Sequence, residues 1–107
     1  MKKRTEILKD IKAGLERRLG NDLKNVILFG SHAWGKPTAS SDYDLLIVLT
    51  QDYDWITERK ISNFCYEIDL KYNIMTDTHI VSEYELQHTL KGYDPVFVNA
   101  LQKGIYA

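Results

Sequence analysis

Apolar residues recur along this chain with periods that predict a helix followed by strands. The first set is spaced as on one face of a helix and comprises Ile7, Leu8, Ile11, Leu15 and Leu19. Gly20-Asn21 is a typical end for such a helix. Two strand-like segments follow, at 26–29 and 44–49, and both are continuous apolar runs apart from Asp44, which opens the second. Continuous runs are typical of central strands covered on both faces, so we expect these two runs to lie inside a sheet.

A second helix and a third strand are predicted in the middle of the chain. Asp52 or Asp54 can cap the helix. Its apolar stripe would comprise Ile61, Phe64, Cys65, Ile68 and Tyr72. The segment 74–81 is rich in β-branched residues and alternates in polarity, which favours a strand.

Two capping signals predict the remaining helices. Ser82 and Glu85 have the spacing of a capping box, and Asp94-Pro95 combines a cap with proline at the first helical position. Gly104 is a plausible end for the last helix. The expected order is α-β-(α)-β-α-β-α-α, an α/β (α+β) fold in which a small mixed sheet of about three to four strands is flanked by helices.

Length and composition are those of one small domain spanning 1–107. The formal net charge is −1, so nucleic acid is not an expected partner, although basic residues are concentrated in the first helix. Cys65 is the only cysteine, which excludes an internal disulfide. No apolar run approaches the roughly 20 residues that span a bilayer, and we expect a cytoplasmic protein without membrane contact.

One segment carries candidate chemistry, because a buried strand ends in Gly30-Ser31 and Asp42-Tyr43-Asp44 opens the next strand. Gly30 permits a sharp turn and the close approach of a phosphate. Ser31 offers a hydroxyl and a backbone N–H to an anion. Asp42 and Asp44 would leave the same strand face, with Cα atoms about 6.6 Å apart.

Two carboxylates that converge in this way favour a cation between them. At about 5 Å and an effective dielectric of about 20 they repel by roughly 3 kcal/mol. Magnesium prefers oxygen ligands and keeps substrate phosphates and water in its shell. The pattern therefore indicates a magnesium site suited to attack on an α-phosphate, with pyrophosphate leaving.

The chain contains its own control for this motif, because Asp52-Tyr53-Asp54 repeats Asp-Tyr-Asp. That copy lies after a strand and before a helix, where helix capping explains it. We therefore interpret the second copy as structural.

At these residues the sequence resembles the minimal nucleotidyltransferases of the DNA polymerase β superfamily. Their pattern is a hydrophobic residue, Gly-Ser, about ten residues, then Asp-hydrophobic-Asp; here ten residues, 32–41, separate Ser31 from Asp42. The resemblance is specific across 26–49 and looser elsewhere. It implies that Gly30 and Ser31 bind the triphosphate, and that Asp42 and Asp44 bind Mg²⁺, with a two-metal site as the complete form.

The resemblance also implies a third carboxylate, from a later strand, that acts as base or completes the metal site. Asp77 lies on the alternating segment 74–81, and Asp69 lies in Glu67-Ile68-Asp69-Leu70. The apolar stripe of the second helix argues that Asp69 is helical, so Asp77 is the preferred third catalytic and metal-binding residue.

The loop after Gly30-Ser31 differs from the family pattern in its positively charged residues. Small members usually carry arginines after Gly-Ser, whereas this chain has His32, Trp34 and Lys36. We expect Lys36 and Ser41 to contribute to nucleotide binding. Trp34 either stacks on a base or covers the core. His79 and His88 have no partner at metal-binding spacing, and we interpret both as structural.

By resemblance, the expected function is transfer of a nucleoside monophosphate, AMP from ATP, to a hydroxyl acceptor. Small family members pair with HEPN-domain toxins as antitoxins, which suggests a tyrosine of such a partner. The alternative is an inactive module that neutralises a partner by contact, using the aromatic residues Trp34, Tyr43, Tyr53 and Trp55. The nucleotide base, the acceptor and the oligomeric state stay open.

Overall fold

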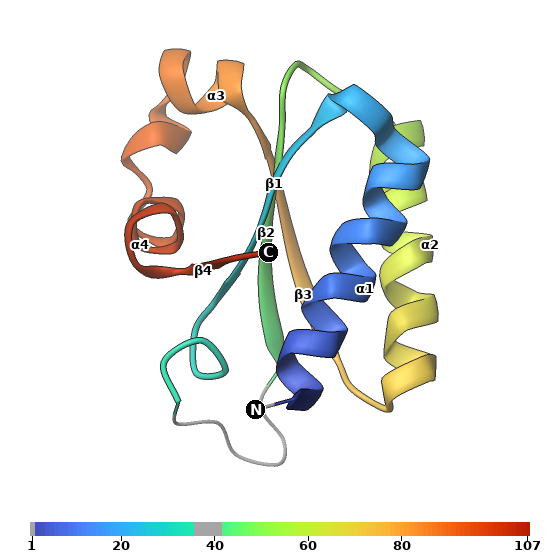
Figure 1. Cartoon of the computed structure of the whole chain (residues 1–107). Helices are drawn as coiled ribbons and strands as arrows, with labels where there is room; N and C mark the ends of the chain where they lie inside the picture. The colour runs from blue at the N-terminus through green and yellow to red at the C-terminus, as the bar shows by residue number, and fades with distance from the viewer. Residues whose placement is uncertain (1, 36–41) are drawn as a thin grey trace.

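The computed structural model describes residues 2–35 and 42–107, which form a sheet between two layers of helices (Figure 1). The helices and strands are, in chain order, α1 Lys2–Leu19, β1 Leu23–Phe29, β2 Tyr43–Leu49, α2 Trp55–Tyr72, β3 Thr76–Ser82, α3 Glu83–His88, α4 Pro95–Lys103 and β4 Ile105–Tyr106. Short 3₁₀ turns at Gly20–Asp22 and Leu90–Tyr93 precede β1 and α4. This arrangement confirms the predicted α/β class with a small mixed sheet.

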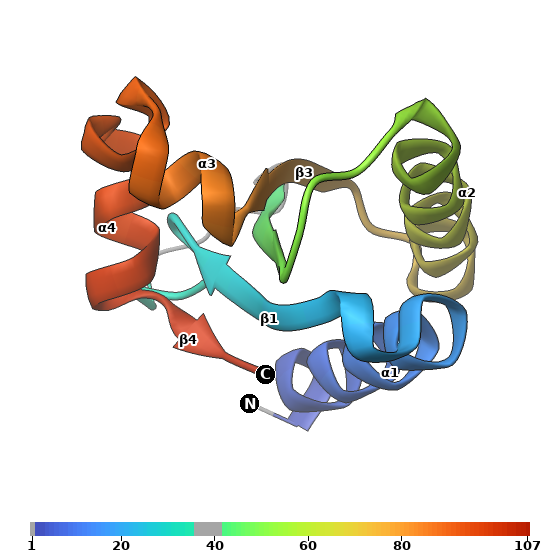
Figure 2. The same ribbon diagram turned by 90° about the horizontal axis from the view of Figure 1, so that it is seen from above.

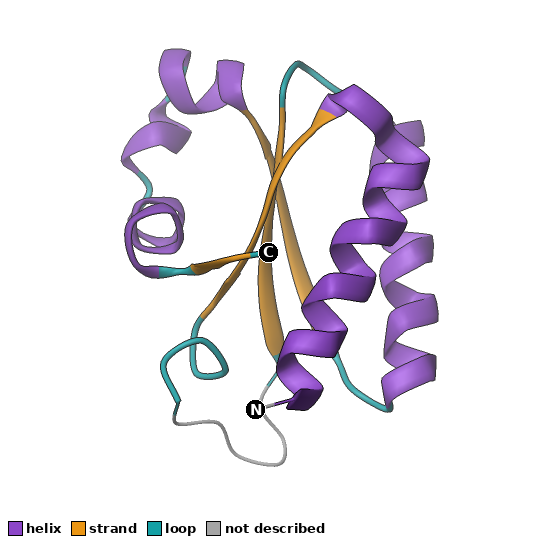
Figure 3. Cartoon of the chain, in the orientation of Figure 1, coloured by secondary structure: helices purple, strands orange, loops and turns teal. Residues whose placement is uncertain are grey.

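The sheet has four strands in the order β3-β2-β1-β4. β1 pairs antiparallel with both β2 and β4, and β2 pairs parallel with β3. The strands form one layer in Figure 3, with α1 and α2 on one face and α3 and α4 on the other. β2 lies centrally and nearly all of its residues are buried, as its continuous apolar run predicted.

Alternate residues of the central strands supply two separate cores, one on each face of the sheet. The face toward α1 and α2 is packed by the strand residues Val26, Leu28, Leu45 and Ile47. The opposite face, toward α4, is packed by Ile27, Leu46, Val48 and Val81. Since strand residues alternate, the first two strands need apolar side chains at every position, and this requirement produces the continuous runs.

The helices match the sequence patterns. In α1 the residues Ile7, Leu8, Ile11 and Leu15 are buried, and Gly20 follows at φ +57°. In α2 the buried stripe is Ile61, Phe64, Cys65 and Ile68. Burial raises the pKa of the Cys65 thiol to about 12, so this cysteine behaves as a small core residue. No helix formed by residues 2–35 and 42–107 has both the length and the apolar character needed to cross a membrane.

All three predicted helix starts are formed. Asp54 accepts a hydrogen bond from the Thr57 amide at the start of α2. The capping box of Ser82 and Glu85 opens α3, and Asp94 with Pro95 opens α4. These starts depend on side chains within three residues of one another, which is why the sequence predicts them.

Ser82 provides a direct test of the capping box. Its side chain is buried, accepts a hydrogen bond from the Glu85 amide at 3.0 Å and donates to Asp52 at 3.3 Å. We expect Ser82→Ala to lower the free energy of unfolding by about 1–2 kcal/mol and Tm by about 4–8 °C. Urea and thermal unfolding measure both values. Ser62→Ala, at an exposed position of α2, is the control and should change them little.

The short strand β4 is not predicted by the sequence. It is only two residues long, and it is held by pairing with Ile27 and Leu28 of β1 and by the Ala107 amide donating to the Val26 carbonyl at 2.8 Å. Two residues are too few to show a periodic pattern, so this strand exists through its tertiary partner.

Candidate functional site

The corner after β1 is built around Gly30. Its φ is +75°, a conformation that L side chains rarely adopt, and its carbonyl accepts hydrogen bonds from the amides of Ala33 and Trp34 at 3.1 and 3.2 Å. A Cβ at this position would lie 2.2 Å from Oδ2 of Asp44. The backbone of Gly30 therefore lies directly against the Asp44 carboxylate, and the following Ser31 opens the turn beside it.

Sheet register brings the predicted carboxylates to this corner. Asp44 pairs with Phe29 across the antiparallel β1–β2 ladder and with Asp77 across the parallel β2–β3 ladder. Asp42 lies two residues before Asp44, immediately ahead of β2. The three carboxylates thus come from the starts of the neighbouring strands β2 and β3. These strand starts lie beside the last residue of β1.

The charges of these groups affect one another. Partial burial is the largest cause that raises the pKa of Asp44, and the neighbouring carboxylates of Asp77 and Asp42 raise it further. His79 acts in the opposite direction. Asp44 is half-buried, whereas Asp42 and Asp77 are exposed to solvent. A group of like charges around a partly desolvated carboxylate is electrostatically costly, and it favours either a proton or a cation.

The donor set suits a hard divalent cation. It consists of carboxylate oxygens, and the absence of a Cβ on Gly30 is what lets the Asp44 carboxylate lie against the backbone of the corner. In the part of the chain that the structure describes, no three His, Cys, Asp or Glu side chains are close enough to hold a metal by themselves. A cation bound here would therefore complete its coordination with phosphate and water oxygens, as magnesium commonly does.

His79 is a neighbour of Asp77 that the sequence interpretation missed. Its Nε2 lies 3.6 Å from Oδ2 of Asp77, and its ring lies between those of Phe29 and Phe97, at centroid distances of 5.7 and 6.5 Å. The sequence spacing could have predicted this contact, because Asp77 and His79 are two residues apart and such residues share one face of a strand. The absence of a histidine or cysteine at metal-binding spacing does not exclude a carboxylate neighbour, which is why that criterion does not find Asp77.

The residues after Gly30-Ser31 contact α1, β2 and the end of α4. The His32 ring stacks on Tyr43 at 3.8 Å, and Arg4 donates to the His32 carbonyl at 2.9 Å. Trp34 is half exposed, and its indole N–H donates to the Lys103 carbonyl at 3.5 Å. The predicted nucleotide contacts Lys36 and Ser41 lie outside the described residues.

Two of the aromatic residues proposed for a contact surface are not freely exposed. Tyr43 is buried under His32. Tyr53 is half-buried and donates its hydroxyl to the Ile80 carbonyl at 3.1 Å, and burial raises its pKa to about 12. Trp34 and Trp55 are exposed, as that hypothesis requires.

Asp69 and Asp77 have different positions. Asp69 lies in α2, as the apolar stripe indicated, and its Oδ1 accepts a hydrogen bond from the Thr76 amide at 3.0 Å at the start of β3. Asp77 lies beside Asp44 in the sheet. Geometry therefore brings Asp77 to the other two carboxylates and gives Asp69 a local role in joining α2 to β3.

The second Asp-Tyr-Asp lies at the opposite end of β2. Asp54 caps α2, and Asp52 accepts a hydrogen bond from the Ser82 hydroxyl at 3.3 Å. The backbone N–H of Thr57 is the largest cause that lowers the pKa of Asp54. The interpretation of Asp52-Tyr53-Asp54 as structural is confirmed. The same three residue types thus lie at a helix start here and beside Gly30 and Asp77 at the other end of β2.

Comparison with known protein families gives a match that covers most of the chain. The family model described as polymerase beta, nucleotidyltransferase matches residues 9–103. This range contains the Gly30-Ser31 corner and the carboxylates at 42, 44 and 77.

Two curated relatives from Methanocaldococcus jannaschii are named as protein adenylyltransferases. One, MJ0604, is 33% identical over 76 residues, which cover 71% of this chain and 71% of the relative. The other, MJ0141, is 36% identical over 70 residues, which cover 65% of this chain and 71% of the relative.

Solved toxin–antitoxin structures share the fold. A mutant of the toxin–antitoxin MntA-HpeT aligns with a TM-score of 0.55 at 19% identity, covering 94% of this chain and 70% of that chain. A toxin–antitoxin with AMP-PNP aligns with a TM-score of 0.57 at 18% identity, covering 92% and 70%. At these identities the likeness is one of fold.

Proposed function

The chain belongs to the polymerase beta nucleotidyltransferase family, and we propose that it transfers AMP from ATP to a hydroxyl group, with a tyrosine of a partner toxin as the acceptor. The observation that carries this proposal is the contact of Gly30 with Asp44, together with the pairing of Asp44 and Asp77 in adjacent strands. This geometry joins the Gly30-Ser31 corner to a group of carboxylates.

In this proposal, the corner binds the triphosphate. Gly30 contributes backbone that carries no Cβ, and Ser31 contributes a backbone N–H and a hydroxyl. Lys36 and Ser41 are assigned further phosphate contacts from the family resemblance alone. Asp42 and Asp44 would hold Mg²⁺ together with phosphate and water oxygens, and Mg²⁺ when bound would offset the negative charge of the phosphates at the reacting centre.

The reaction itself is a substitution at the α-phosphorus. The acceptor oxygen forms a bond to the α-phosphorus, and the bond from that phosphorus to the α–β bridging oxygen breaks. Pyrophosphate leaves with the electron pair of the broken bond. Asp77 accepts the hydroxyl proton, a role that suits an exposed carboxylate at the rim of the site.

The comparisons support the nucleotide and the acceptor in this proposal. The relatives are named as protein adenylyltransferases, which favours AMP as the group transferred and a protein as its recipient. One structural neighbour is a toxin–antitoxin with AMP-PNP, an ATP analogue. A HEPN-type toxin as the partner, and its tyrosine as the acceptor, rest on the family resemblance.

Labelled ATP tests the proposal. The purified chain is incubated with Mg²⁺ and a co-expressed candidate toxin, using ATP labelled at either the α- or the γ-phosphate. We expect the α-label alone to enter the toxin, with loss of transfer when EDTA is added. Incorporation of the γ-label would identify a kinase instead, and absence of both labels from the toxin would contradict the proposal.

Asp77→Asn is expected to lower kcat about 10²–10⁴-fold with a smaller change in KM for ATP, because it removes the proton acceptor. Steady-state kinetics with the toxin as acceptor measure both parameters. Asp69→Asn is the matched control, since an amide oxygen can still accept from the Thr76 amide. Equal losses in the two variants would contradict the role of Asp77.

A contact-only module is the second candidate, and exposed apolar residues near α4 favour it. Leu90 and Tyr93 are 85% and 81% exposed, and Val96 adjoins them in sequence at 43%. Large exposed apolar groups are common in protein interfaces. Calorimetric titration separates the two functions: toxin binding without binding of ATP and Mg²⁺ would favour the contact-only module.

A further inference from the structure

A groove lies between α1 and the edge strand β4, apart from the three carboxylates. Its volume is about 330 Å³. It is lined by Arg4, Thr5, Leu8, Lys9, Lys12, Ala13, Glu16, Ile105, Tyr106 and Ala107. Figure 2 shows β4 ending beside the N-terminal half of α1, and the Lys12 ammonium donates to the Ala107 carbonyl at 3.1 Å across this boundary.

The backbone of β4 is open toward this groove. β4 is the last strand in the sheet order, so it has a partner strand on one side only. The amide of Ala107 bonds to Val26, and Ile105 lies opposite Leu28. Residues of an antiparallel pair alternate in the direction of their backbone groups, so the N–H and C=O of Tyr106 point away from β1. An open strand edge is a template for an added strand.

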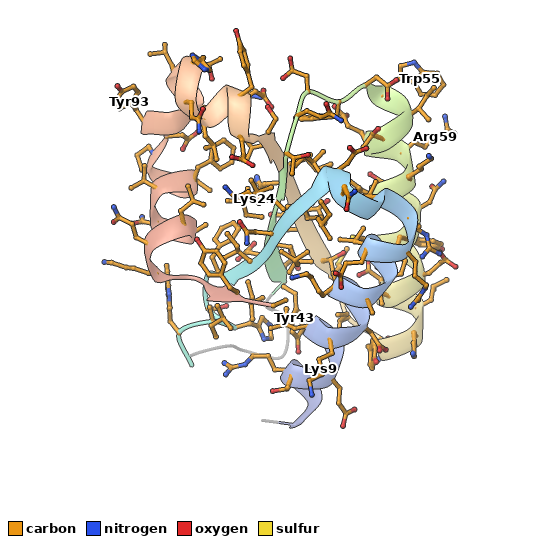
Figure 4. All side chains as sticks on the ribbon, turned by 45° about the horizontal axis from the view of Figure 1, so that its top comes forward. Lys9, Lys24, Tyr43, Trp55, Arg59 and Tyr93 are labelled. Atoms are coloured by element: carbon orange, nitrogen blue, oxygen red, sulfur yellow. The ribbon has the colours of Figure 1, made fainter. Side chains whose placement is uncertain are left out.

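The walls of the groove combine apolar surface with positive charge. Leu8, Ala13 and Ile105 supply the apolar part. The charged side chains of the lining are three cations, Arg4, Lys9 and Lys12, and one carboxylate, Glu16, which is an excess of two positive side-chain charges in a chain whose net charge is −1. Lys9 projects from α1 in Figure 4. This local charge is opposite in sign to that of the molecule.

We propose that this groove binds an extended acidic segment of a partner protein, which adds to β4 as a further strand. The Tyr106 backbone would bond to the added strand, as in other peptides recognised by strand addition. The acidic side chains of the bound segment would contact Lys9 and Lys12. An aliphatic side chain between two acidic residues of that segment would cover Leu8 and Ile105. Arg4 lines the groove and also donates a hydrogen bond to the His32 carbonyl. It therefore connects the proposed binding groove to the loop that follows Gly30-Ser31. The proposal is independent of the catalytic assignment.

A fluorescein-labelled peptide of alternating Glu and Val tests the proposal by fluorescence anisotropy with the full chain. We expect saturable binding that Lys9→Glu weakens roughly tenfold, since it turns an attraction into a repulsion. Ala13→Trp should abolish binding by filling the groove, because Ala13 is exposed and the larger side chain leaves the core intact. Hydrogen exchange of the Tyr106 amide should slow when the peptide is present.

Arg17→Glu is the matched control, because it makes the same charge change at an exposed position of α1 that does not line the groove. It should weaken peptide binding less than about twofold. Equal weakening by Arg17→Glu and Lys9→Glu would overturn the proposal, as would unchanged exchange at Tyr106. Failure of the Glu-Val peptide to bind would also overturn it, whether or not phosphatidylserine vesicles bind in its place. A Lys-Val peptide that binds equally well would do the same.

Discussion

Replacing Asp42 and Asp44 together with asparagine is expected to abolish AMP transfer, lowering kcat by at least about 10³-fold, because metal-ion stabilisation of a phosphoryl transition state is worth several kcal/mol. The substitution keeps the size of both side chains and removes their charge. Incorporation of α-labelled AMP into the toxin measures the loss. Activity equal to that of the natural sequence would contradict the proposed site.

The same variant should remain folded, and this separates loss of chemistry from loss of structure. The pKa of Asp44 is raised by burial first and then by Asp77 and Asp42, so its charged form is disfavoured in the folded chain. A neutral amide removes that cost at pH 7, where carboxylates are normally charged. In metal-free buffer we therefore expect Tm to stay the same or rise, as measured by thermal unfolding.

The second Asp-Tyr-Asp provides a control of identical chemistry. Asp52→Asn together with Asp54→Asn changes the same residue types around Tyr53, at the far end of β2. Asparagine is also a good N-cap, so α2 should keep its start. This variant should transfer AMP at close to the natural rate. A comparable loss in both double variants would show that the effect does not depend on the position of the motif.

Gly30→Ala is expected to reduce kcat/KM by at least about 10²-fold, because a misplacement of about 1 Å at a reacting centre can cost that much. The added Cβ would lie 2.2 Å from Oδ2 of Asp44, so either the corner or the carboxylate must move. The φ of +75° adds strain of about 1–3 kcal/mol. Kinetics with labelled ATP and thermal unfolding measure the two effects.

Gly20→Ala separates backbone strain from contact with the site. Gly20 also has a positive φ, +57°, but a Cβ there would meet nothing within 4 Å. It should therefore lower stability by about 1 kcal/mol and leave the transfer rate unchanged. If Gly20→Ala reduced activity as strongly as Gly30→Ala, general destabilisation would explain both results, and the close approach of Gly30 to Asp44 would lose its significance.

The sequence by itself predicted the elements whose causes are local. The helical spacing through Ile11 and Leu15 gave α1, the continuous run at 44–49 gave the central strand, and Ser82 with Glu85 gave the start of α3. Each depends on residues within one or two turns, or on alternate residues of one strand. The Gly-Ser corner followed by Asp-x-Asp also lies within one short segment, and so it could be recognised without knowledge of the fold.

Tertiary structure decided which distant residues meet. The parallel register of β2 and β3 places Asp77 beside Asp44, and the packing of α2 against β3 lets Asp69 accept a hydrogen bond from the Thr76 amide. The strand β4 and the groove beside it exist only because β1 supplies a partner. Side-chain periodicity records which face of an element is buried but not which other element covers it. Pairing across the sheet is set by the combined packing of both faces, and no single segment of this chain contains that information.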